Sequence, residues 1–137
     1  MLVIRKEQME VFQNLSDKAF AAKIISCLRQ SHPEWFADIP EDSLVTRTLC
    51  AIRRSRRYHL GSDEDVVTFV ALMFSVAPDF DTHPPIHAVL TDQNISVSHR
   101  IAALLCLVAP ADWDRVRERP SAEAWRQIIE EEGSHEM

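Results

Sequence analysis

The chain has 137 residues, 46% of them hydrophobic, which is enough to build a buried core and excludes intrinsic disorder. Its formal net charge of −6 argues against general binding to the phosphate backbone of nucleic acids. Only Gly61 and Gly133 are glycine, which excludes P-loops and dinucleotide-binding folds, because their motifs need two or three glycines in one turn. Such a composition favours helices joined by proline-marked turns.

Residues 5–31 carry apolar side chains at helical spacing, but the pattern leaves open whether they form one helix or two. Ser16 is a candidate cap for a second helix, which should end near Ser31 because the residue before Pro33 is pushed out of the α region. Trp35 and Phe36 are expected in the loop that follows.

Pro40 is expected to open the next helix, which collects four arginines near its C-terminal end and stops at Gly61. Ser62 should cap a helix over about 62–77. Apolar residues cover nearly its whole circumference, so we expect it to be the largely buried central helix.

The second half of the chain predicts three further helical segments and a short one around Trp113. A short helix is expected over Pro85–Leu90, and Ser96 should cap a largely buried helix over Val97–Val108. The last helix starts at Pro120-Ser121, and we expect it to fray at its C-terminal end, where three glutamates oppose the helix dipole.

Together these segments predict an all-α protein: a compact single-domain bundle of about six helices over residues 1–137. The N-terminal residues lack the pattern of a signal peptide, and the longest apolar run, Ile101–Ala109, is too short to span a membrane. Three cysteines without a CxxC motif are interpreted as reduced core thiols. We therefore expect a cytoplasmic protein.

One polar cluster, in the stretch LMFSVAPDFDTHP that ends at Pro84, could carry chemistry. Asp79, Asp81, His83 and His87 are four possible metal ligands within nine residues. His83 and His87 have the spacing of one helix face, but Pro84 and Pro85 are expected to interrupt that helix. The alternative is that the two aspartates make local turn bonds to backbone amides while Phe80 fills the core. We favour this alternative and predict no metal and no cofactor.

Nothing else in the sequence selects a reaction. A GxSxG nucleophile elbow is impossible without glycines, and Ser98 and His99 are adjacent, so they point in different directions on a helix. The arginines at 53–57 fit a helix end that pairs with Asp63, Glu64 and Asp65 better than a nucleic-acid patch. We therefore predict that the protein is not an enzyme.

Aromatic residues beside prolines and acids are the best candidates for a partner-binding surface, because tryptophans in loops often anchor interfaces. Trp35-Phe36 and Trp113 are expected to expose apolar surface. The predicted partner-binding residues are Trp35, Phe36, Asp79, Phe80, Asp81 and Trp113.

Four stretches carry a resemblance to a known group of proteins: VIRKEQMEVF near the start, HPEWF, the arginine-rich helix end with Tyr58, and LMFSVAPDFD. They resemble small helical bacterial proteins whose genes lie in type VI secretion effector clusters, beside the spike proteins VgrG and PAAR and adaptor chaperones. The resemblance extends to about Asp92, and Arg5, Phe80 and Asp81 match its pattern. Where this chain has Val76 or Ala77 the group usually has a glycine, so the turn before Pro78 is expected to differ.

The resemblance implies a cytosolic accessory factor without an active site. Some such proteins act as co-chaperones of the adaptor that loads a toxin. The leading hypothesis is therefore a protein-binding co-chaperone for effector loading, whose partner is an adaptor chaperone or an effector. The alternative is an immunity protein that inhibits a cognate toxin, since an acidic chain suits a nuclease with a basic cleft. A third possibility, a small metal-dependent enzyme, rests only on the four possible ligands between Asp79 and His87.

Overall fold

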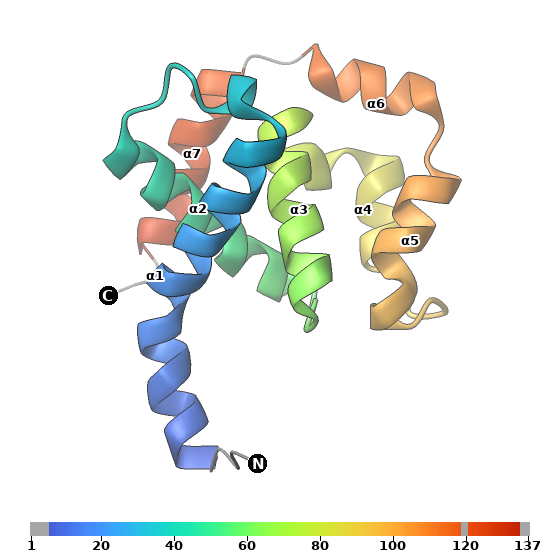
Figure 1. Ribbon diagram of the computed structural model, residues 1–137. Coiled ribbons are helices and arrows are strands. Elements are labelled where there is room, and N and C mark those ends of the chain that lie inside the picture. Colours follow the sequence, from blue (N-terminus) through green and yellow to red (C-terminus); the bar gives the residue numbers. More distant parts are fainter. Residues whose placement is uncertain (1–5, 119–120, 135–137) are drawn as a thin grey trace. The chain divides into compact units, whose positions relative to one another are not determined.

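The computed structural model describes residues 6–118 and 121–134, and within these ranges it contains seven α-helices, two short 3₁₀ turns and no strand (Figure 1). The all-α prediction is confirmed, with one helix more than the expected six or so. The chain divides between Leu49 and Cys50, inside the second helix, into two units. The prediction of a single domain over 1–137 stays a prediction.

Unit 1 contains α1 (Lys6–Ser31), the 3₁₀ turn η1 (Pro33–Trp35) and the first half of α2 (Glu41–Arg57). The structure settles the open question about residues 5–31, because α1 is continuous over its 26 residues. Ser16 therefore lies inside a helix and does not cap one. Among the residues of α1 whose burial is described, from Asp17 onward, the buried ones follow the spacing of one helix face; they are Ala21, Ile24, Ile25 and Leu28.

The start of α2 follows the prediction, whereas its end does not. The amide of Leu44 donates to the carbonyl of Pro40 at 2.9 Å, so the helix begins directly after the proline. At the other end α2 stops at Arg57, and the left-handed residue that follows is His59, with a φ of 62°. Gly61 does not have a positive φ and is not the terminating residue.

Unit 2 is built around α3 (Asp63–Ser75), whose N-terminus is capped as expected. The Ser62 hydroxyl accepts a hydrogen bond from the amide of Asp65 at 3.1 Å. The helix is largely buried, as expected: none of its residues from Asp65 onward is exposed. The fully buried residues form one stripe, namely Val66, Phe69, Val70 and Met73. Several other apolar residues of this helix are half-buried, which leaves apolar surface at its C-terminal end.

The proline-rich segment after α3 forms the 3₁₀ turn η2 (Phe80–Thr82) and α4 (Pro84–Leu90), which pack against each other. The prolines do not interrupt a helix here, because they occupy its first positions, where a missing amide hydrogen costs nothing. His83 is the N-cap residue, and its carbonyl accepts from the amide of His87 at 2.8 Å.

Three helices complete unit 2: α5 (Val97–Leu107), α6 (Pro110–Arg117) and α7 (Ser121–Ser134). The expectation that α5 is largely buried is wrong, since only Ile101 and Leu104 are fully buried in it. Helix α5 packs on α4 and α3 with that side, and its opposite side is exposed. The cysteine prediction also needs correction, because only Cys50 is buried while Cys27 and Cys106 are exposed free thiols.

The described helices include none that is both long enough and apolar enough to cross a membrane.

Candidate functional site

Unit 2 contains a cluster of three polar residues, Arg54, Tyr58 and Asp81, here called the Asp81 cluster, in which Arg54 and Asp81 are buried and Tyr58 is half-buried. Arg54 Nε donates to Asp81 Oδ1 at 2.9 Å and to Oδ2 at 3.0 Å. The Tyr58 hydroxyl donates to Asp81 Oδ2 at 2.5 Å. The side chains of Arg54 and Asp81 are only 7% and 2% exposed. Both charges are therefore buried and matched to each other.

The protonation states in this cluster follow from its burial. Burial raises the pKa of the Tyr58 hydroxyl well above its usual value, and the hydrogen bond to Asp81 and the negative charge of that carboxylate act in the same direction. For Arg54, desolvation lowers the pKa, but the charge of Asp81 and its hydrogen bond outweigh it, so the net direction is upward. At neutral pH Tyr58 is a neutral donor and Arg54 a cation, which suits a structural clamp.

The cluster joins elements that are far apart in the sequence. Arg54 lies near the end of α2, Tyr58 directly follows that helix, and Asp81 belongs to η2. Arg54 Nη1 also lies 3.4 Å from Glu131 of α7. Arg57 Nη2 lies 2.7 Å from Glu132 Oε1, close in distance though without hydrogen-bond alignment. These contacts correct two expectations: Arg54 and Arg57 pair with Asp81 and the glutamates of α7, and Asp81 makes ion-pair rather than turn bonds.

The same contacts bear on the predicted fraying of α7. The helix continues through Glu130–Glu132 to Ser134. Glutamates near a helix C-terminus are unfavourable by themselves, but two of these three face arginines. The charge that opposes the dipole is thus offset by tertiary contacts.

Phe80 lies next to Asp81 in η2 and places the cluster beside an aromatic core. Its ring centroid is 5.0 Å from that of Phe69 in α3 and 6.2 Å from that of Trp113 in α6. Phe80 is fully buried, whereas Trp113 is half-buried. The aromatic contacts therefore run from the core to the accessible surface at α6.

At that surface unit 2 has an open apolar groove of about 270 Å³, here called the α3–α5–α6 groove. The end of α3, the end of α5 and the length of α6 form its walls. The lining residues are Leu72, Val76, Leu105, Val108, Pro110, Trp113, Asp114 and Arg117. Arg117 and Asp114 are its charged side chains, and they pair at 3.4 Å.

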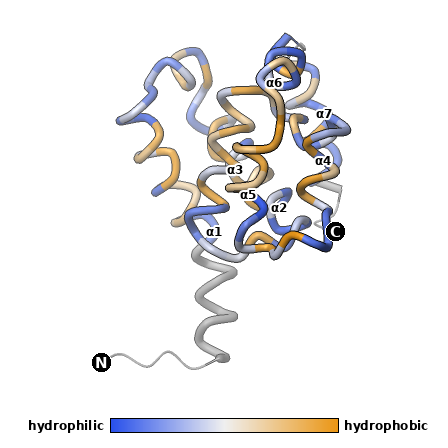
Figure 2. Tube along the Cα trace, turned by 90° about the vertical axis from the view of Figure 1, so that its right-hand side faces the viewer, coloured by the Kyte–Doolittle hydropathy of each residue, from blue (hydrophilic) through white to orange (hydrophobic). Residues whose placement is uncertain are grey.

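The exposed side of α5 extends this apolar surface. Leu105 is 54% exposed and lines the groove, and Leu107 is 66% exposed and does not line it. The tube through α3 and α5 is largely orange in Figure 2, which marks hydrophobic residues. Exposed large apolar side chains that adjoin a groove are typical of sites that bind another protein.

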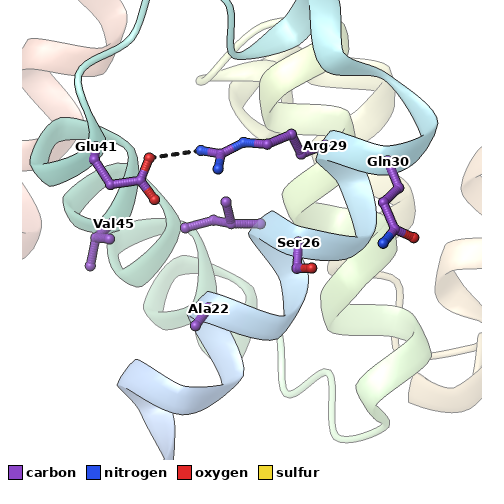
Figure 3. A pocket seen from close by; sticks show the side chains of 7 residues that line it. Ala22, Ser26, Arg29, Gln30, Glu41 and Val45 are labelled. Carbon is purple, nitrogen blue, oxygen red and sulfur yellow. Dashed lines mark hydrogen bonds and ion pairs between the residues drawn. The ribbon is translucent and has the colours of Figure 1, made fainter.

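Unit 1 has a groove of similar size, about 280 Å³, between α1 and the start of α2. In Figure 3 Arg29 of α1 reaches across it to Glu41, and Nη2 lies 2.8 Å from Oε2. Ala22, Ile25 and Val45 supply its apolar lining, whereas Ser26 and Gln30 are polar. Four of its seven lining residues are polar or charged, against two of eight in the α3–α5–α6 groove, so it is the weaker candidate for an apolar partner.

The structure distributes the predicted partner-binding residues over both units. Trp35 is half-buried, and its ring stacks on His32 with centroids 4.0 Å apart. Phe36 is buried, so the expected exposure of Trp35-Phe36 is wrong for Phe36. Phe80 and Asp81 are buried, whereas Asp79, the N-cap residue of η2, is half-buried. Among the six, Trp113 lines the apolar groove.

The possible metal ligands do not converge. Asp81 is occupied by Arg54 and Tyr58, and His83 Nε2 lies 3.0 Å from Asp112 Oδ1 of α6. Within residues 6–118 and 121–134, no group of three or more His, Cys, Asp or Glu side chains is placed to hold a metal ion.

A serine and a histidine do meet at the start of α5, although the pair differs from the one considered in the sequence. Ser96 Oγ lies 2.6 Å from His99 Nδ1, whereas Ser98 Oγ is 3.5 Å away. Both Ser96 and His99 are exposed. Nucleophilic catalysis needs donors arranged around a developing oxyanion in a site that excludes water, and this exposed turn does not exclude water.

Sequence reasoning missed most of the groove. Leu72, Val76, Leu105 and Val108 belong to runs so apolar that burial was the natural interpretation. The signal for exposure was the composition of Val97–Val108, which has apolar residues on more sides than one packing neighbour can cover.

No protein-family model matches this chain, and neither the curated proteins nor the solved structures contain a significant match. The resemblance to proteins of type VI secretion effector clusters therefore stays a prediction.

Proposed function

We propose that this chain is a non-enzymatic, protein-binding accessory factor, a co-chaperone that assists an adaptor chaperone in loading type VI secretion effectors. The observation that carries the protein-binding part is the α3–α5–α6 groove with Leu105 and Trp113 accessible in it. The effector-loading part is supported by the sequence resemblance described above.

The groove suits a protein partner better than a small polar substrate. A concave apolar site that accepts a large side chain is the usual environment of interface residues that contribute most of the binding energy. The clamp formed by the Asp81 cluster lies within the same unit and fixes η2, from which Phe80 contacts Trp113. A wall held in this way loses little conformational entropy on binding.

Co-expression tests this function. The tagged chain is produced with an adaptor chaperone from a type VI effector cluster of the same genome, and the complex is isolated by affinity and size-exclusion chromatography. We expect co-elution with the wild-type chain and its loss with Leu105→Ser, whereas Leu107→Ser should still co-elute. Absence of co-elution for the wild-type chain would reject the co-chaperone role.

The alternative is an immunity protein, and the net charge of −6 favours it because many toxins that act on nucleic acids have basic clefts. Expression of the chain should then rescue cells that produce the cognate toxin. Rescue without any adaptor would favour immunity over effector loading.

A further inference from the structure

We infer that the α3–α5–α6 groove binds an amphipathic helix of a partner protein whose apolar ridge is flanked by lysine or arginine. This inference rests on the proposed protein-binding function and names the chemistry of the partner. It follows from the helical backbone of the groove walls, from their apolar lining and from the charges that surround them.

The backbone of the walls argues for a helical partner. All eight lining residues lie in or cap α3, α5 or α6, where most amide and carbonyl groups are engaged within the helices. The described residues contain no strand, so no sheet edge is available to pair with an extended peptide. A partner must therefore satisfy its own backbone, and a helix does so while presenting apolar side chains.

The charges at the groove argue for a basic flank. Leu72 and Val76 mark the C-terminal end of α3, and Leu105 and Val108 mark that of α5. A helix C-terminus carries partial negative charge, and neither of these two helices has a basic residue in its last turn. Two negative helix ends without a basic residue in their own last turns therefore meet at one groove.

Side chains near the groove do not reverse this sign. Arg117 pairs with Asp114, whose side chain is 71% exposed and can accept from a second cation. The positive end of α6 has Asp112 in its first turn. Since the whole chain carries −6, the field that a partner meets at the groove favours positive charge.

Fluorescence anisotropy with two labelled helical peptides tests the inference on the full chain. Both peptides are about 18 residues long, so that they can form helices, and share leucines at positions i, i+3, i+4 and i+7. One has lysine at the flanking positions and the other glutamate. We expect the lysine peptide to bind at least about tenfold more tightly, with an advantage that shrinks as salt is raised, because exposed charges are screened.

Three variants locate the binding. Leu105→Ser, inside the groove, should weaken the lysine peptide about tenfold, while Leu107→Ser, an exposed leucine outside the lining, should change it less than about twofold. Asp114→Asn should weaken it about threefold and leave the glutamate peptide unchanged or tighter. Because all three residues are exposed, circular dichroism should show the wild-type helix content in each variant.

The outcomes are decisive in both directions. Equal or tighter binding of the glutamate peptide, no binding of the lysine peptide, or equal effects of the two leucine variants would overturn the inference. If an adaptor co-elutes in a Leu105-dependent manner while the lysine peptide fails, the helix chemistry is wrong and the proposed function stands. If the peptide binds in the groove and no adaptor co-elutes, the proposed function falls and the helix-binding groove stands.

Discussion

Replacing Asp81 by asparagine should be among the most destabilising single exchanges of a polar residue in this chain. Asparagine keeps the size of the side chain but removes its charge. One of the two carboxylate oxygens of Asp81 is replaced by an amide NH₂ group, which cannot accept a hydrogen bond. Arg54, with a 7% exposed side chain, would then keep only the largely exposed Glu131, 3.4 Å from Nη1, as a counter-ion. The bond from Tyr58 to Oδ2 would be lost or replaced.

Removing one partner of a buried ion pair typically costs about 3–5 kcal/mol, because the remaining charge stays desolvated. Asparagine can still accept one bond from Arg54, so we expect about 3 kcal/mol, at the lower end of that range. A domain of this size is stable by about 5–15 kcal/mol, so the loss would shift the unfolding transition visibly. Urea unfolding followed by circular dichroism at the helical band measures it.

Asp114→Asn is the matched control, because Asp114 also pairs with an arginine but at a surface site where both side chains are more than half exposed. It should cost less than about 0.5 kcal/mol. In a double-mutant cycle, Arg54→Met should cost much less in the Asp81→Asn background than alone, with a coupling of about 2 kcal/mol or more. If the free energies of unfolding of Asp81→Asn and Asp114→Asn differed by less than about 1 kcal/mol, the interpretation of the Asp81 cluster as a structural clamp would be refuted.

Three further predictions follow from local geometry. Tyr58 is the single tyrosine, so the increase in absorbance at 295 nm that accompanies tyrosinate formation reports its ionisation alone. Its pKa should lie above the ordinary value of about 10 in the folded chain and return there in denaturant. Because the folded state holds this proton more tightly than the unfolded state, its contribution to stability is present below a pH of about 10 and is lost as the pH rises further. The free energy of unfolding of Tyr58→Phe should therefore fall less steeply with alkaline pH than that of the wild-type chain. Identical pH profiles for the two proteins would contradict the burial argument. His59→Gly should stabilise the chain by about 0.5–1 kcal/mol, because glycine adopts the left-handed conformation of this position without strain. Gly61→Ala should also stabilise it by about 0.4–1 kcal/mol, because Gly61 has no positive φ and a Cβ there would meet open space. If either variant unfolded at a lower urea concentration than the wild-type chain, the assigned end of α2 would be wrong. Ser62→Ala should lower the free energy of unfolding by about 1 kcal/mol, because the Ser62 hydroxyl caps α3. Ser96→Ala should lower it by less than about half of that, because Ser96 makes no capping hydrogen bond. Equal unfolding midpoints for the two variants would refute the distinction.

Much of the fold was predictable because helix signals are local. Glycine scarcity, the proline positions and the apolar spacing predicted α2, α4 and α7 close to their starts, and the Ser62 cap is present as expected. The errors concern signals that compete within a few residues. Ser16 is a good capping residue, but α1 continues through it, and Gly61 is a good terminator, yet the chain turns at His59 first.

The candidate site was less predictable, because exposure and pairing depend on what packs against each face. Trp113 was expected to expose apolar surface and lines the groove, while Phe36, expected to be exposed as well, is buried. Leu105 and Leu107 were expected in a buried helix and are exposed, since α3 and α4 cover only one side of α5.

The sequence by itself determined the helical character of this protein, because backbone flexibility, capping and apolar periodicity act over a few neighbouring residues. Only the tertiary structure decided that Asp81 meets Arg54 across 27 positions and that glutamates of α7 offset the arginines of α2. It likewise decided which apolar side of α5 stays uncovered. Such pairings depend on how packed helices bring distant residues together, and no local pattern encodes that.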